Sequence, residues 1–314
     1  MISRKTLATE MNTQKYLQLV LEQQSLSGES EEVKALRSER DNVEKFLRSH
    51  FKDSKPSIQY AGSYKKGTMI RDNYDLDVVC YFNHDDTSAG ETLEEIFNNV
   101  KKALESGYHV EPKKSALRLE SSDSDRARIY FHIDVVPGRF IDENQDDVFL
   151  YQSSGEKERL KTNLQKHIDH IKGSRLIDTI KLVKIWKERN GFREIKTFIL
   201  ELLVIKIAKD LKDSDGLDVC LKNFWEELRD NIDDIEIEDP ANPTGNDLSD
   251  LFDDSIRDTI SLLARKTLDF IESQGWEAIF GKSESVSDEE KIVAVQAAIL
   301  QDSDRPVKPW CDIV

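Results

Sequence analysis

The spacing of apolar residues changes near residue 156, and this change constrains the fold more than any other feature of the sequence. Before it, short runs of β-branched and aromatic residues stand between turn residues, which is typical of strands. The expected strands are 57–61, 75–82, 115–120, 126–136 and 147–151. Beyond it, apolar residues recur at intervals near 3.6, the period of a helix. The sequence therefore predicts an α/β half followed by a helical half.

Helical periodicity is also found before and between the expected strands. The expected helices are 5–25, 31–52, 91–106, 156–172, 174–190, 197–212, 217–230, 252–273 and 288–301. No internal repeat at a fixed period is found. We expect two domains: residues 1–155, an α/β domain with long N-terminal helices, and residues 156–314, a helical domain.

The charge balance bears on the kind of partner that the protein can bind. Its 61 acidic and 45 basic residues give a net charge of -16, which counts against a long nucleic acid as substrate. Three widely spaced cysteines fit a reducing compartment better than a disulfide framework. No apolar run approaches the roughly 20 residues of a membrane helix, and no secretory signal is seen. We expect a soluble cytoplasmic protein that does not bind membranes.

Two aspartates open the most apolar of the expected strands. Asp75 and Asp77 leave the strand on one face and Leu76 on the other, because side chains alternate along a strand. Two like charges side by side cost free energy unless a cation lies between them. Magnesium suits such a pair, since it takes oxygen ligands from carboxylates and from substrate phosphates. The alternative is an exposed strand edge with two solvated carboxylates.

A third aspartate, Asp134, lies near the end of the apolar stretch "ARIYFHIDVVPGR" at 127–139. An isolated aspartate in this position is usually a strand-end or turn residue. If its strand lies next to that of Asp75 and Asp77, however, the three carboxylates are enough for a site for two metal ions. Such sites promote in-line displacement at phosphorus.

The segment "GSYKKGT" at 62–68 is a candidate phosphate-binding bend. Gly62 lets the backbone approach an anion closely, and Ser63 offers a hydroxyl and an N–H group. It is not a Walker loop, because the spacing differs. Gly-Ser pairs also mark ordinary turns, so its distance of about a dozen residues from the aspartate pair gives it its weight.

These motifs in order resemble a known superfamily. Gly62-Ser63, Gly67-Thr68, Asp75-x-Asp77 and Asp134 within "HIDVVPG" resemble the polymerase-beta-type nucleotidyltransferases. The segments "TIKLVKIWKERNGFREIKTFILELLVI" (179–205) and "DPANPTGND" (239–247) resemble the branch of oligoadenylate synthase, animal cyclic GMP-AMP synthase and the bacterial CD-NTases of antiphage defence. The resemblance implies an α+β nucleotidyltransferase core with a mixed sheet, followed by a mostly helical domain that completes the nucleotide pocket.

The resemblance also implies roles for individual residues. Asp75, Asp77 and Asp134 match the family's metal-binding triad, which would hold two Mg²⁺ ions, with Mn²⁺ as a possible substitute. Matches to the family's nucleotide-binding residues are Gly62, Ser63, Lys181, Lys184, Thr197 and Phe198. Ser63 and the two lysines would bind the donor triphosphate, and Thr197 stands where the family has a phosphate-binding serine. Without the resemblance, a solvated helix face would explain both lysines, and Phe198 would be a core residue.

The function implied is a magnesium-dependent nucleotidyltransferase that joins nucleoside triphosphates, ATP among them, into a cyclic di- or trinucleotide second messenger with release of pyrophosphate. We expect a monomer, with a downstream effector that binds the product rather than this protein. One alternative is a template-independent enzyme that extends RNA 3′ ends or makes linear oligonucleotides, which the net charge of -16 disfavours. Another is an inactive nucleotide-binding scaffold, against which the intact triad argues. The sequence leaves the bases and the linkage open.

Two histidines lie outside these motifs. His167 and His170 are spaced i, i+3 on an expected helix, which is a chelating distance. Neither a cysteine nor a third histidine stands close to them in the sequence, so we expect a solvated pair rather than a zinc site.

Overall fold

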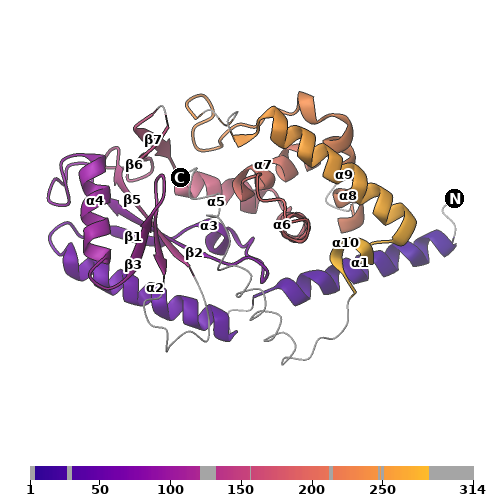
Figure 1. Cartoon of the computed structure of the whole chain (residues 1–314), viewed down its shortest axis with the longest axis horizontal. Coiled ribbons are helices and arrows are strands. Elements are labelled where there is room, and N and C mark those ends of the chain that lie inside the picture. Colours follow the sequence, from indigo (N-terminus) through magenta and orange to yellow (C-terminus); the bar gives the residue numbers. More distant parts are fainter. Residues whose placement is uncertain are drawn as a thin grey trace.

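The computed structural model describes residues 4–26, 30–120, 132–155, 157–211, 215–246, 248 and 251–282. It has a mixed β-sheet with helices at one end and a group of helices at the other (Figure 1). The strands are β1 (Ser57–Tyr60), β2 (Leu76–Phe82), β3 (His109–Pro112), β4 (Leu117–Glu120), β5 (Ile133–Phe140), β6 (Val148–Tyr151) and β7 (Arg159–Thr162). The expected α+β class, a mixed sheet followed by a mostly helical region, is confirmed.

Helices stand on both sides of the strand-rich segment in the sequence. They are α1 (Arg4–Gln24), α2 (Glu31–His50), α3 (Gly62–Lys66), α4 (Leu93–Leu104), α5 (Leu164–Gly173), α6 (Ile177–Arg189), α7 (Thr197–Ala208), α8 (Leu217–Asp230), the 3₁₀ helix η1 (Ile232–Asp234), α9 (Asp254–Gln274) and α10 (Glu277–Phe280). Local sequence fixes several of their starts. The Thr92 hydroxyl accepts from Glu95 N–H and the Glu95 side chain accepts from Thr92 N–H, which closes a capping box at the start of α4.

The sheet has the order β1-β2-β5-β4-β3, with β6 paired to β5 and β7 paired to β6. Strands β2 and β5 run parallel and every other pair is antiparallel. The parallel pair lies at the centre and is joined by a long connection through α4, β3 and β4. Its register sets Leu76 opposite Ile133 and Asp77 opposite Asp134.

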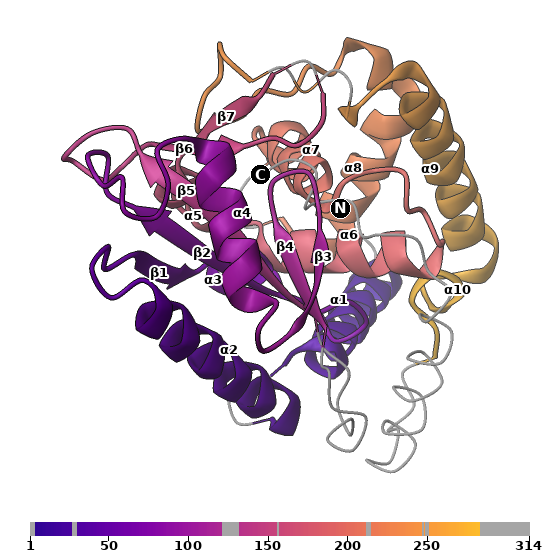
Figure 2. The same cartoon turned by 60° about the vertical axis from the view of Figure 1, so that its left-hand side comes forward.

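The two faces of β2 have different partners. Leu76, Val78 and Cys80 point into an apolar core shared with α2 and α4, which cover this face (Figure 2). Asp77 and Val79 point to the other face, where a pocket lies between the sheet and the helices. The alternation along the strand therefore separates the core from the pocket.

The helical end has its own core. Helix α7 is apolar on almost every side and packs among α6 and α8, while α8 packs on α9. Trp186 and Trp225 lie at the centre, with no exposed surface. Leu17 and Val20 of α1 belong to this core. The first helix therefore packs with the C-terminal helices, although it precedes the sheet in the sequence.

Most predicted elements are confirmed, and the differences are local. The helix expected over 156–172 was wrong in its first part, because Arg159–Thr162 forms β7 and the helix begins at Leu164, after the N-cap Asn163. Strand β3 and the short α10 were not predicted. The helix expected at 288–301 lies outside the described residues, as do residues 126–131 of the strand expected at 126–136. The rest of that strand corresponds to β5, which runs on to Phe140. Nothing in the structure tests the predicted boundary at residue 155.

Candidate active site

Three buried aspartates lie at the β2–β5 junction. Asp77 and Asp134 are opposite each other in the parallel register, and Asp75 comes one residue before β2. Their exposed fractions are 6% for Asp75, 2% for Asp77 and 0% for Asp134. Asp75 and Asp77 line the pocket. The sheet thus brings together the three carboxylates that the sequence placed on two strands.

In this site, opposite charges only partly compensate for the burial of the Asp77 carboxylate. Its Oδ1 atom is buried and has no hydrogen-bond partner. Burial, followed by the neighbouring charges of Asp134 and Asp75, holds the pKa of this carboxyl well above its usual value. A buried carboxylate oxygen that accepts no hydrogen bond is suited to bind a cation. The residues present therefore fit a divalent metal ion.

Asp134 has a protein cation as its partner. Nε of Arg118 donates to Oδ1 of Asp134 over 2.9 Å, and Nη2 donates to Oδ2 over 2.7 Å. The described residues contain no group of three His, Cys, Asp or Glu side chains already arranged to hold a metal ion. The three aspartates lie close together, but the carboxylate of Asp134 is hydrogen-bonded to Arg118.

The bend after β1 brings "GSYKKGT" against the aspartates. The Ala61 N–H donates to the Asp77 carbonyl over 2.8 Å, which ties the bend to β2. Gly62 has φ +55°, and a Cβ there would overlap the Asp77 carboxylate. Only glycine fits both the backbone angle and the close approach. Ser63 follows in α3 and lines the pocket.

Two lysines reach the pocket from different elements. Lys184 of α6 is buried, donates to the Thr68 carbonyl over 2.8 Å, and has its pKa lowered to about 8, chiefly by burial. Lys66 of α3 forms an ion pair with buried Glu201 of α7 over 2.5 Å. The Thr68 hydroxyl donates to the same carboxylate over 2.7 Å. Although burial alone would raise the pKa of Glu201, the lysines and these hydrogen bonds lower it, so the carboxylate stays charged.

The other predicted nucleotide-binding residues divide into two groups. Thr197 and Phe198 at the start of α7 line the pocket. Lys181 is half-buried on α6 and is not part of the pocket lining. The position of Lys181 therefore gives its predicted phosphate role no support, whereas Lys184, one turn later, does face the pocket.

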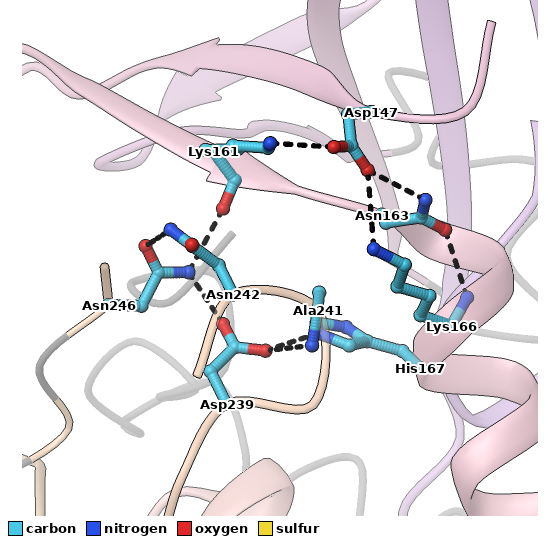
Figure 3. A network of polar contacts seen from close by, with 9 residues as sticks. All are labelled: Asp147, Lys161, Asn163, Lys166, His167, Asp239, Ala241, Asn242 and Asn246. Atoms are coloured by element: carbon cyan, nitrogen blue, oxygen red, sulfur yellow. Dashed lines mark hydrogen bonds and ion pairs between the residues drawn. The ribbon is translucent and has the colours of Figure 1, made fainter. Parts of the chain in front are cut away.

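The wall of the pocket that faces the helices is held by a polar network (Figure 3). His167 Nε2 and Asp239 Oδ1 are 2.8 Å apart, and the His167 ring lies 5.0 Å from the Phe198 ring. Asn246 donates to Asp239 over 2.6 Å and to the Lys161 carbonyl of β7 over 2.9 Å. The segment after η1 thereby connects the pocket wall to the edge of the sheet.

A family model, described as the "Second Messenger Oligonucleotide or Dinucleotide Synthetase domain", matches residues 11–174, which is 164 of the 314 residues. The chain belongs to this family. As a member of the Second Messenger Oligonucleotide or Dinucleotide Synthetase family, the protein is a nucleotidyltransferase that makes cyclic nucleotide second messengers. Membership leaves its specific product open.

Similar proteins agree with this membership of the synthetase family. A cyclic AMP-AMP-AMP synthase of Escherichia coli (strain MS 115-1) is 24% identical over 300 residues, which covers 78% of this chain and 88% of that protein. The structure of E. coli MS115-1 CdnC with ATP has a TM-score of 0.63 at 22% identity, covering 86% and 98% of the two chains. The Bradyrhizobium diazoefficiens CD-NTase CdnG with GTP gives 0.67 at 13% identity, covering 93% and 100%. At these identities the solved structures share the fold.

Sequence reasoning missed several residues of this synthetase's pocket. Lys66 stands in the quoted "GSYKKGT", but within that segment only Gly62 and Ser63 were predicted to bind phosphate, and Lys66 lines the pocket as well. The expectation of a solvated pair was wrong for His167, which lines the pocket and bonds to Asp239. Nothing local to Arg118 marks it as a partner of Asp134, since the two meet only through strand pairing.

No helix in the described part of this synthetase has the length and apolarity needed to cross a membrane.

Proposed function

We propose that Asp75, Asp77 and Asp134 hold the magnesium ions of this synthetase. The observation that carries the proposal is the register that sets Asp77 opposite Asp134 on parallel strands beside the pocket. Two Mg²⁺ ions bound there would lower the pKa of an attacking ribose hydroxyl and offset the charge of the leaving pyrophosphate. Mn²⁺ would substitute, because it accepts the same oxygen ligands.

Besides the metal ions, side chains of the protein itself would bind the triphosphate in the pocket. Ser63 and Lys66 of α3 and Lys184 of α6 line this pocket, and their hydroxyl and ammonium groups would bind the phosphates. Glu201 forms an ion pair with Lys66, and although burial lowers the pKa of Lys184, the charge of Glu201 opposes that lowering. The donor α-phosphorus would then lie beside the aspartates, in line with the acceptor hydroxyl.

For the nucleobases, we propose stacking on the rings of Phe198 and His167. The two rings are 5.0 Å apart at an interplanar angle of 36°, and both line the pocket. Asp239 fixes the orientation of the His167 ring through a 2.8 Å bond. ATP is the proposed substrate, because the similar protein of Escherichia coli (strain MS 115-1) is a cyclic AMP-AMP-AMP synthase. The product would leave to act on a separate effector.

The aspartate assignment is tested with Asp77→Asn. We expect loss of pyrophosphate release from ATP and Mg²⁺, by at least about a thousandfold, because the variant keeps the shape of the side chain and removes its charge. Asp85→Asn, at an exposed carboxylate away from the pocket, is the matched control and should keep normal turnover. Near-normal pyrophosphate release from Asp77→Asn would contradict the assignment.

The product is tested by mass spectrometry after incubation with a mixture of ATP, GTP, CTP and UTP. We expect a phosphatase-resistant cyclic product that contains adenine and that disappears when ATP is omitted. The same reaction with labelled ATP and added RNA tests the extension of RNA 3′ ends. Label in the RNA, or a product without adenine, would contradict the proposal.

A further inference from the structure

Arg118 is a buried cation in the active site for which the proposed reaction has no role. It lies on β4, opposite Asp134 of β5, and is 4% exposed. Its guanidinium takes both carboxylate oxygens of Asp134, at 2.9 and 2.7 Å. A planar guanidinium bound at two points fixes the orientation of its partner.

The guanidinium also reaches toward β2, which is not a neighbour of β4. Strand β5 lies between them in the sheet. Yet Nη2 of Arg118 is 3.9 Å from Oδ2 of Asp75, as well as 2.7 Å from Oδ2 of Asp134. The positive charge of the side chain is therefore held next to both carboxylates, where a cation that bridged Asp75 and Asp134 would have to bind.

A divalent ion and this guanidinium compete for the same oxygens. Both oxygens of Asp134 already accept hydrogen bonds, and a second positive charge at such short range is repelled in a buried site. Asp77 differs, because one of its buried oxygens has no hydrogen-bond partner. A cation can therefore bind beside Asp77 without displacing Arg118, whereas an ion that uses Asp134 cannot.

We propose that Arg118 is a positioning residue that holds Asp134 in the metal-free site and competes with the second metal ion for it. One ion binds at Asp75 and Asp77, and the second binds when the guanidinium gives up at least one oxygen of Asp134. The second ion therefore binds more weakly than the first. This inference rests on the proposed role of the three aspartates as metal ligands.

The test is a titration of the full chain with Mn²⁺ in the absence of nucleotide. Electron paramagnetic resonance measures how much Mn²⁺ is bound at each step. Arg118→Met should bind the second Mn²⁺ roughly tenfold or more tightly than the wild type, because one unit charge next to the ion is gone. Arg118→Lys keeps the charge but loses the two-point grip, so its gain should be smaller. If Arg118 only supported the fold, folded Arg118→Met would bind the second Mn²⁺ equally or more weakly, and that result overturns the proposal.

Two further variants separate this inference from the proposed function. Arg139→Met removes another arginine of the sheet, on β5, which donates to backbone carbonyls such as that of Glu91; Mn²⁺ binding should not change. Asp77→Asn should lose the first Mn²⁺. If Asp77→Asn keeps both ions, the proposed metal site fails. If it loses the first ion but Arg118→Met shows no gain, the inference about Arg118 alone fails.

A measurement on the wild type keeps the proposal testable even if Arg118→Met does not fold. The Nε–H resonance of Arg118 can be assigned by its absence in Arg118→Lys. Saturating Mg²⁺ with a non-hydrolysable ATP analogue should shift this resonance and speed its exchange with water, because the bond to Asp134 opens. An unchanged Arg118 resonance under those conditions overturns the proposal.

Discussion

At the scale of single residues, the site keeps charges that the fold would be more stable without. Asp77 has a buried oxygen with no hydrogen-bond partner, and Lys184 is a buried ammonium group. Each group loses hydration on folding, and the neighbouring protein charges compensate only in part. Such costs at a site are expected where a ligand of opposite charge is to bind.

Asp77→Asn should therefore stabilise the metal-free protein while it abolishes activity. We expect a gain of about 1–2 kcal/mol in the free energy of unfolding near neutral pH, measured by urea denaturation with a chelator present. Because the pKa of Asp77 is raised in the folded state, its ionisation costs stability as the pH rises above the usual 3.8. The gain should shrink toward acid pH. A gain that does not depend on pH, or a loss of stability, would contradict this account.

The lowered pKa of Lys184 leads us to expect that substrate binding depends on pH. Its pKa is lowered to about 8, so the metal-free, nucleotide-free pocket loses this positive charge as the pH rises through that value. We expect the KM for ATP to rise between pH 7 and 9, with a smaller change in kcat. In Lys184→Met the KM should be high throughout and should lose that part of the pH dependence. If the KM of the wild type and the KM of Lys184→Met rise in parallel with pH, Lys184 is excluded as the titrating group.

At the scale of elements, the short bend between β1 and β2 decides how close the proposed phosphate-binding segment, residues 62–68, comes to the carboxylates. Gly62 and Gly67 both have positive φ, at +55° and +80°. A Cβ at Gly62 would overlap Asp77, whereas a Cβ at Gly67 would meet nothing within 4 Å. A substitution at either glycine strains the backbone, but only at Gly62 does the added Cβ also overlap Asp77. Comparing the two positions therefore separates the two effects.

Gly62→Ala should cost far more activity than Gly67→Ala. Both substitutions add backbone strain of about 1 kcal/mol, which thermal unfolding would show. Only Gly62→Ala also pushes the Asp77 carboxylate aside, so we expect its kcat to fall by roughly a hundredfold or more. Gly67→Ala should keep most of its turnover. Equal losses in the two variants would show that backbone strain alone matters.

At the scale of the whole molecule, the pocket lies between two cores and depends on contacts that join them. The sheet supplies the aspartates, the helices supply Lys184 and Phe198, and the segment around Asp239 connects the two regions (Figure 3). Burial opposes ionisation of Asp239, but hydrogen bonds from His167, Asn246 and the Ala241 N–H outweigh it and lower the pKa of Asp239. This network is thus a hydrogen-bonded clamp on the pocket wall.

Asp239→Asn should loosen that clamp without unfolding the protein. We expect faster hydrogen exchange of the backbone amides of 239–246 and a several-fold higher KM for ATP, because the His167 ring loses its charged partner. Asp233→Asn, at an exposed carboxylate of the nearby η1, is the matched control. Slow exchange of the segment and an unchanged KM in Asp239→Asn would show that the clamp has no role in binding.

Much of the fold and of the candidate site could be predicted, because both depend on local patterns. The apolar run from Val78 to Phe82 predicts a buried strand, and the alternation of its side chains predicts that Asp75 and Asp77 share a face. The helix signals at 174–190 and 197–212 likewise correspond to α6 and α7. Strand β7 could not be predicted, since its four residues have polar and charged neighbours and are defined only by pairing with β6.

The sequence by itself determined which residues are the candidates for the chemistry: the Asp-x-Asp pair, the third aspartate and the Gly-Ser bend, because each is recognisable from its neighbours along the chain. Only the tertiary structure decided what surrounds them. Arg118 reaches Asp134 across paired strands, and His167 meets Asp239 from 72 residues away. The physical reason is that periodicity specifies which face of an element is buried, but not which element lies against it. Strand order and helix packing make that choice, and with it the charges that the site holds.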